Sequence, residues 1–238
     1  MPPRKTPDYI FLTILAVLVI FGLMMLTSAS GPLAYQKFSD SYWYIKHQLF
    51  FGVVPGALLF FLFAKTDYHR LRRFAPYFLV LGILLLVEVF VPGLRANWGT
   101  SRSWLKLGPF SLQPIEFVKL FLLIYFAYWF EKKSSKEVAS LQKGLLPFLV
   151  VFGVCAVLIM KQPDLGGLLI VSVIAFSMYF MAGAPLQYFA GLFALGVAGV
   201  IWMIKIAPYR LARLATFLHP ELDPKGIGYQ INQAFLAI

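Results

Sequence analysis

Charged residues are scarce in this sequence. Asp, Glu, Lys and Arg make up 13% of its 238 residues, whereas soluble domains carry about 25%. Because 60% of the residues are hydrophobic, a single domain of this length has too little interior to hide them from water. The composition therefore excludes a water-soluble globule and predicts a protein whose solvent is the lipid bilayer.

Acidic residues and cysteine are especially few. Ten Asp and Glu stand against 21 Lys and Arg, which gives a formal net charge of +11. The apolar runs hold almost none of this charge, so the cations concentrate in the connections. There they suit anionic lipid headgroups or a phosphate-bearing substrate better than nucleic acid. The single cysteine, Cys155, excludes a disulfide framework and a thiolate metal site within the chain.

Long uncharged runs make up much of the rest. A membrane-spanning helix needs about 20 mostly apolar residues, and about seven such segments are predicted. The stretch from Asp164 to Lys205 is long enough to cross twice, with Gly183-Ala184-Pro185 as the hairpin between the two helices. The sequence thus predicts an all-α, polytopic membrane helix bundle. The other spans are expected near residues 8–27, 48–64, 74–90, 114–130 and 145–160.

Lys and Arg are distributed unevenly between the two sets of connections. With the N-terminus inside, the inner connections before Asp164 hold ten cations and the outer ones six, which favours a cytoplasmic N-terminus. The outer cations are still numerous enough to need a functional explanation. Residues 102–112 and 208–218 mix such cations with apolar residues and are predicted to lie in the interface plane as interfacial helices. The outer six cations are Lys37, Lys46, Arg95, Arg102, Lys106 and Lys161.

The first polar cluster stands at the start of the fourth predicted span. Pro114 suits the first turn of a helix, and the positive helix end stabilises Glu116 beside it. Glu116 and Lys119 are three residues apart on one helical face at membrane depth, where ionisable side chains are costly and face a cavity or each other. A structural pair and a role in a substrate channel both stay open. Arg102 and Trp104 lie just upstream.

A second polar turn, Gln162-Pro163-Asp164, precedes the sixth predicted span. Asp164 is a good helix N-cap, and Gly166-Gly167 allows a neighbouring helix to approach closely. Capping alone is enough to explain the aspartate. The functional alternative is that the turn dips into the bundle beside Glu116.

A third polar segment follows the last predicted span. Arg210 and Arg213 share a helical face, from which they are able to clamp a pair of phosphates. Downstream, Asp223-Pro224-Lys225-Gly226 has the composition of a type I turn. Such turns favour aspartate at the first position, so the turn alone is enough to explain Asp223. The alternative is an irregular loop that holds Asp223 for chemistry.

Taken in this order and at these spacings, the segments resemble the SEDS family (shape, elongation, division and sporulation), most closely its cell-division branch, FtsW. The family usually has Pro-Ser-Glu where this chain has Pro114-Ile115-Glu116, and it typically has ten helices. We therefore expect residues 1–238 to be a single membrane domain that lacks the last helices, either as a fragment or as a short member. The segments that carry the resemblance are Leu26-Thr27-Ser28-Ala29-Ser30, Val91-Pro92-Gly93, Ser101-Arg102-Ser103-Trp104, Gln113-Pro114-Ile115-Glu116-Phe117-Val118-Lys119, Gln162-Pro163-Asp164-Leu165-Gly166, Pro208-Tyr209-Arg210 and Asp223-Pro224-Lys225-Gly226-Ile227-Gly228-Tyr229-Gln230.

The resemblance implies a peptidoglycan glycosyltransferase that polymerises lipid II in the bacterial cytoplasmic membrane. It implies a class B penicillin-binding transpeptidase and other division membrane proteins as partners, at the septum. Asp223 matches the proposed catalytic aspartate of the family. The other matching motif positions, expected to bind substrate, are Arg102, Trp104, Glu116, Lys119, Asp164 and Arg210.

A mechanism follows as a hypothesis. Glycan polymerisation needs a base for the acceptor sugar's 4-hydroxyl and positive charge for the departing lipid diphosphate. Asp223 is assigned as the base, Trp104 as a holder of the lipid-linked sugar, and cations as the diphosphate site. The sequence specifies no cofactor, although a divalent cation such as Mg²⁺ or Mn²⁺ is an option. The diphosphate cations are Arg102, Lys119, Arg210 and Arg213.

Two other functions stay open. Intramembrane Glu116, Lys119 and Asp164 would also suit a flippase that carries the lipid-linked precursor across the bilayer. A flippase needs no base, so Asp223→Asn would leave flipping intact. The third alternative is a non-catalytic scaffold for a division transpeptidase, which would tolerate alanine at every one of these polar positions.

Overall fold

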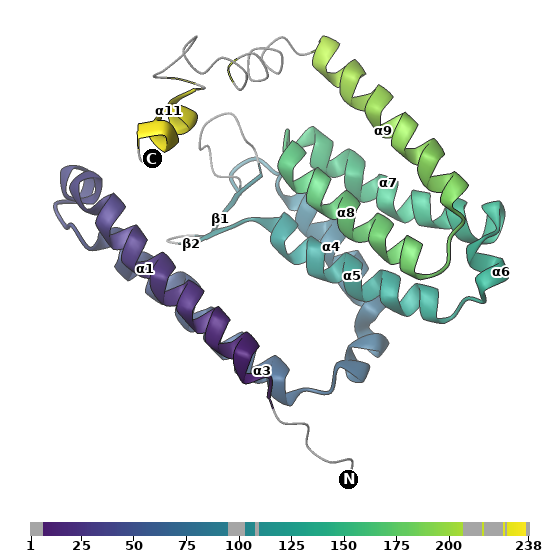
Figure 1. Ribbon diagram of the computed structural model, residues 1–238, viewed down its shortest axis with the longest axis horizontal. Coiled ribbons are helices and arrows are strands. Elements are labelled where there is room, and N and C mark those ends of the chain that lie inside the picture. Colours follow the sequence, from purple (N-terminus) through teal and green to yellow (C-terminus); the bar gives the residue numbers. More distant parts are fainter. Residues whose placement is uncertain are drawn as a thin grey trace.

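The computed structural model describes residues 7–94, 103–107, 110–206, 216, 226 and 228–236. Within these ranges the regular elements are helices, except for one pair of antiparallel strands (Figure 1). The elements are α1 (Tyr9–Phe38), α2 (Trp43–Gln48), η1 (Leu49–Val53), α3 (Val54–Lys65), η2 (Tyr68–Arg70), α4 (Leu71–Glu88), β1 (Leu105–Leu107), β2 (Phe110–Leu112), α5 (Pro114–Glu131), α6 (Ser135–Val138), η3 (Leu141–Leu145), α7 (Leu146–Lys161), α8 (Leu165–Met181), α9 (Leu186–Ile206) and α11 (Tyr229–Leu236).

Three helical segments are long and apolar enough to cross a membrane. They are α1, the continuous run from α2 through α3, and the run from η3 through α7. Helices α4 and α5 have 18 residues each, α8 has 17 and α9 has 21, so each is roughly 25–32 Å long at 1.5 Å per residue. These lengths match a hydrocarbon core about 30 Å thick. The prediction of an all-α membrane bundle is confirmed, and each predicted span overlaps one of these helices.

Helix α1 extends to Phe38, well beyond its predicted end at Thr27. The predicted span ends at Thr27 because polar residues begin there. In the helix, however, the Thr27 hydroxyl donates to the Leu23 carbonyl over 2.8 Å and the Ser30 hydroxyl to the Leu26 carbonyl over 2.6 Å. Because these hydroxyls bond within their own helix, they do not need water and do not end it.

The core of the bundle lies between α4, α5, α7 and α8. Helix α5 packs against both α4 and α8, and α7 completes the layer. Phe126, Phe148 and Tyr179 are fully buried there, with ring centroids 5.1 Å apart for the first pair and 4.6 Å for the second. The Tyr179 hydroxyl donates to the Val138 carbonyl over 3.0 Å, which ties α8 to the turn at α6. Aromatic packing thus makes one rigid group of helices.

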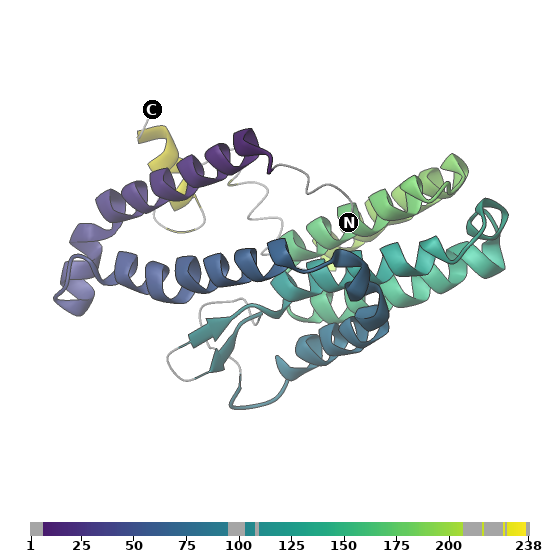
Figure 2. The same ribbon diagram turned by 90° about the horizontal axis from the view of Figure 1, so that it is seen from below.

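Helices α1 and α3 run in opposite directions and are joined through α2 and η1 (Figure 2). Ala34 is the one buried residue of α1, and α3 has none. Their exposed side chains are almost all apolar, as expected for helices whose solvent is lipid.

Strands β1 and β2 pair with each other in an antiparallel sheet, so the interfacial helix predicted for residues 102–112 is wrong. Leu105 pairs with Leu112, and Leu107 with Phe110. Leucines alternate with Lys106, which is the two-residue period of a strand, and Gly108-Pro109 between the strands disfavours a helix. The other predicted interfacial segment, residues 208–218, lies outside the described residues apart from Thr216.

The connections divide between the two ends of the bundle. The turn before α2, the β hairpin and the turn before α8 lie toward one end, whereas η2, α6 and the turn before α9 lie toward the other (Figures 1 and 2). This alternation is what consecutive membrane crossings produce. It also brings the polar segments of the α5 and α8 starts together.

Candidate functional site

Asp164 joins the start of α8 to the start of α5. Its Oδ1 accepts the Gly167 amide over 2.8 Å, so Asp164 is the N-cap of α8 as predicted. Its Oδ2 accepts the side-chain amide of Gln113, the residue before α5, over 3.4 Å. The carboxylate therefore does more than cap, because it also fixes the segment that carries the hairpin and Glu116.

Gln162 holds the same turn to a third helix. Its side chain is 1% exposed, and its Nε2 donates to the Leu86 carbonyl near the end of α4 over 2.9 Å. A buried amide is costly unless it is hydrogen-bonded, so this contact fixes where the turn sits. From the sequence, Gln162 was noted only as part of the polar turn before α8, and no role was predicted for it. A polar side chain directly after a long apolar helix was the available signal.

The close packing of α5 and α8 depends on Gly167. A Cβ at this position would lie 2.2 Å from Ile115 Cδ1 and 2.8 Å from Asp164 Oδ2. Ile115 is 2% exposed and belongs to the core. A side chain here would force Ile115 or Asp164 to shift, which agrees with the close helix approach predicted from Gly166-Gly167.

Glu116 and Lys119 form an ion pair on α5. Lys119 Nζ lies 2.7 Å from Glu116 Oε2, and the two side chains are 22% and 57% exposed for the lysine and the glutamate. The structural pair that the spacing suggested is therefore present, and the exposed carboxylate stays accessible for a second role. Glu116 and Asp164 each lie at a helix N-terminus, where the helix dipole favours a negative charge.

The base of the hairpin is anchored in the protein. Ser103 and Leu105 are 1% and 2% exposed, and Trp104 between them is half-buried. The Lys106 amide donates to the Leu94 carbonyl over 2.8 Å. Trp104 thus has a fixed position on the same end of the bundle as Asp164.

The structure therefore brings Asp164 near the start of α5, with Glu116 in the first turn of that helix and Lys119 one turn further along. Four predicted site residues lie outside the described residues, and their roles stay predictions. They are Arg102, Arg210, Arg213 and Asp223.

Asp164 offers a test that separates its cap from its charge. Asp164→Ala should lower the free energy of unfolding by about 1 kcal/mol because the Gly167 amide loses its partner, whereas Asp164→Asn should keep the stability because asparagine caps equally well. Thermal unfolding of the purified chain in detergent measures both. An equal loss in the two variants would show that the negative charge, or the second oxygen that accepts from Gln113, stabilises the junction rather than the cap.

A model of the FtsW/RodA/SpoVE family, described as "Cell cycle protein", matches residues 8–238. The chain belongs to this family. It is 36% identical over 227 residues to the probable peptidoglycan glycosyltransferase FtsW of Trichlorobacter lovleyi, an alignment that covers 95% of this chain and 59% of that protein. It is also 36% identical over 239 residues to the stage V sporulation protein E of Bacillus subtilis, covering 100% and 65%. The chain thus spans about three fifths of the length of these relatives.

Solved structures of family members have the same fold. The rod shape determining protein RodA of Thermus thermophilus matches with a TM-score of 0.66 at 29% identity, over 83% of this chain and 61% of that one. A chain from a peptidoglycan synthase complex that coordinates polymerization and crosslinking matches with a TM-score of 0.68 at 29% identity, over 92% and 64%. The family and the apolar helices together show an integral membrane protein.

Proposed function

We propose that this chain is part of a peptidoglycan glycosyltransferase that polymerises lipid II at the outer face of the cytoplasmic membrane. The observation that carries the proposal is the family match over residues 8–238. This range contains every motif position, including Asp223. The relatives named probable peptidoglycan glycosyltransferase support it. A polar junction at one end of an apolar bundle also suits a lipid-linked substrate, whose headgroup stays at the membrane surface.

The proposed chemistry divides between the aspartate and the cations. Asp223 takes the proton from the acceptor's 4-hydroxyl as its oxygen attacks the donor's anomeric carbon, and the lipid diphosphate leaves with the bonding electron pair. Positive side chains stabilise the charge that develops on that diphosphate. Trp104, on the anchored hairpin, holds the lipid-linked sugar. The cations assigned to the diphosphate are Arg102, Lys119, Arg210 and Arg213.

Within this proposal the polar junction has a positioning role. Asp164 fixes Gln113, and Gln113 precedes the helix that bears Glu116 and Lys119. A shift of this turn would move α5 and the hairpin together. Asp164 is therefore expected to act through the position of the substrate-binding segment.

The proposal includes a place in the cell and partners. Residues 1–238 form one SEDS-type membrane domain with a cytoplasmic N-terminus, at the division septum. A class B penicillin-binding transpeptidase and other division membrane proteins work beside it. The peptidoglycan synthase complex whose chain has the same fold supports a partner that crosslinks the strands.

A divalent cation remains an option for the same site. Mg²⁺ or Mn²⁺ would be held by Asp223 together with oxygens of the substrate diphosphate, and it would supply positive charge there. In the described part of the chain, no three His, Cys, Asp or Glu residues converge on a point that could hold a metal. We therefore assign no step to such an ion.

Polymerisation of purified lipid II tests the proposal. The chain, reconstituted with its transpeptidase partner, should convert lipid II into glycan strands that gel electrophoresis resolves. A parallel assay follows the passage of labelled lipid II across vesicles. If labelled lipid II crosses the vesicle membrane but no glycan strands form, the function is that of a flippase. The intramembrane pair of Glu116 and Lys119 is the observation that supports this alternative. If neither process occurs, the scaffold function takes its place.

A further inference from the structure

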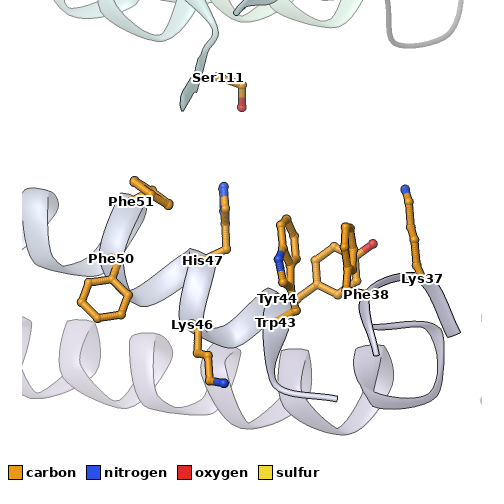
Figure 3. A pocket seen from close by; sticks show the side chains of 9 residues that line it. All are labelled: Lys37, Phe38, Trp43, Tyr44, Lys46, His47, Phe50, Phe51 and Ser111. Atoms are coloured by element: carbon orange, nitrogen blue, oxygen red, sulfur yellow. The ribbon is translucent and has the colours of Figure 1, made fainter. Parts of the chain in front are cut away.

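A groove of about 870 Å³ lies between the end of α1, the start of α2 and the strand β2. Its volume is in the range of small-molecule sites, about 300–1,000 Å³. Figure 3 shows its lining, which comes from Lys37 and Phe38 of α1, from α2 and η1, and from Ser111 of β2. Apart from Ser111 of the hairpin, the groove is built by segments that are not part of the junction at Asp164.

One wall of the groove is a row of stacked rings. The centroids of Phe38 and Trp43 are 3.9 Å apart with planes 8° from parallel, and those of Trp43 and His47 are 5.1 Å apart with planes 20° from parallel. Because these rings cover one another's faces, the row offers a ligand mainly ring edges. Ring edges carry partial positive charge and the indole N–H lies on one of them, so this wall suits an anion.

The charged side chains that line the groove, Lys37 and Lys46, are both cationic. Figure 3 shows Lys37 and His47 extending toward the side of Ser111, and Lys37 Nζ lies 5.5 Å from the Phe38 ring centroid. The described lining contains no Asp or Glu, and no described carboxylate forms an ion pair with Lys37. The ammonium group is therefore available for an anion in the groove.

The second lysine at the groove is in a different situation. Lys46 extends to the opposite side (Figure 3) and lies 2.8 Å from Asp40 Oδ2. The hydrogen bond from Lys46, together with one from the Tyr42 amide, holds the pKa of the Asp40 carboxyl below its usual value. Lys46 is thus already paired, which makes it a matched control for Lys37.

The place of the groove in the fold indicates what kind of anion it binds. It lies where two long apolar helical segments, α1 and the run from α2 through α3, reach their common end. Phe50 and Phe51 border it and are 69% and 40% exposed, and the side chains of α3 beyond them are exposed and apolar. A ligand with a phosphate in the groove would thus have apolar surface beside it for acyl chains.

We propose that this groove binds the phosphate headgroup of an anionic membrane lipid, with Lys37 and the ring row of Phe38, Trp43 and His47 as its binding groups. The site is independent of the glycosyltransferase function proposed above. It also gives Lys37, one of the outer cations in the sequence, a role of its own.

The test compares short-chain lipids on the purified chain in neutral detergent. Dioctanoyl phosphatidylglycerol should raise the unfolding temperature in a saturable manner, and dioctanoyl phosphatidylcholine and inorganic phosphate should do so much less. Lys37→Gln should weaken the apparent affinity for phosphatidylglycerol about fivefold, the effect expected of one lysine at an anionic surface. Lys46→Gln, the matched control, should leave it unchanged.

Three outcomes would overturn the proposal. If wild type and Lys37→Gln bind phosphatidylglycerol with equal affinity, Lys37 is not a binding group. If Lys46→Gln loses as much affinity as Lys37→Gln, the effect comes from general surface charge. If inorganic phosphate stabilises the chain as strongly as phosphatidylglycerol does, the groove is a site for free phosphate. None of these readouts depends on lipid II turnover.

Discussion

Asp223→Asn should abolish the polymerisation of lipid II while the chain still folds and inserts. A general base contributes about 10²–10⁴-fold to a rate, and an amide cannot accept the proton of the acceptor's hydroxyl. The substitution keeps the size of the side chain, so the loss would report chemistry rather than packing. Strand synthesis from purified lipid II, normalised to the amount of folded protein, measures the effect.

Glu221→Gln is the matched control for this variant. Glu221 is a carboxylate two residues away in the same proline-containing segment, so the two substitutions remove the same charge from the same neighbourhood. Glu221→Gln should retain most of the activity. If both variants polymerise as well as wild type, the base lies elsewhere, and if both fail equally, net charge near the diphosphate explains the loss.

The helices were predictable because membrane spans obey a simple length rule. Pro114 marks the first residue of α5 both in the prediction and in the structure, since proline at the first turn is a local signal. Strands β1 and β2 were missed because their charged and apolar residues were interpreted as an interfacial helix, although the alternation around Lys106 has the period of a strand.

The site was predictable only as far as local signals extend. The cap by Asp164 and the pair of Glu116 and Lys119 each join residues three positions apart, and such spacings are visible in a sequence. Gln113 and Asp164 are 51 positions apart, and Gln162 and Leu86 are 76 apart. Their contacts depend on how α4, α5 and α8 pack, which single-sequence patterns do not encode.

Gly167→Ala should lower the stability of the contact between α5 and α8. The new Cβ would meet Ile115 Cδ1 at 2.2 Å and the capping carboxylate of Asp164 at 2.8 Å. Forcing an extra methyl into a packed core costs about 1–3 kcal/mol, and in this case the cap would be disturbed as well. The expected fall in the unfolding temperature is about 2–4 °C for each kcal/mol, measured in detergent.

Two further variants separate this clash from other effects. Gly166→Ala adds the same methyl one residue earlier, where the nearest atom is Asp164 Oδ1 at 3.9 Å, so it should be neutral or stabilising because alanine favours a helix. Ile115→Val removes Cδ1 itself and, combined with Gly167→Ala, should restore part of the stability. A double variant whose loss equals the sum of the single losses would mean that Ile115 does not make the contact. A recovered double variant would show that the clash with Ile115 at the start of α5 causes the loss, beside the junction of Asp164 and Gln113.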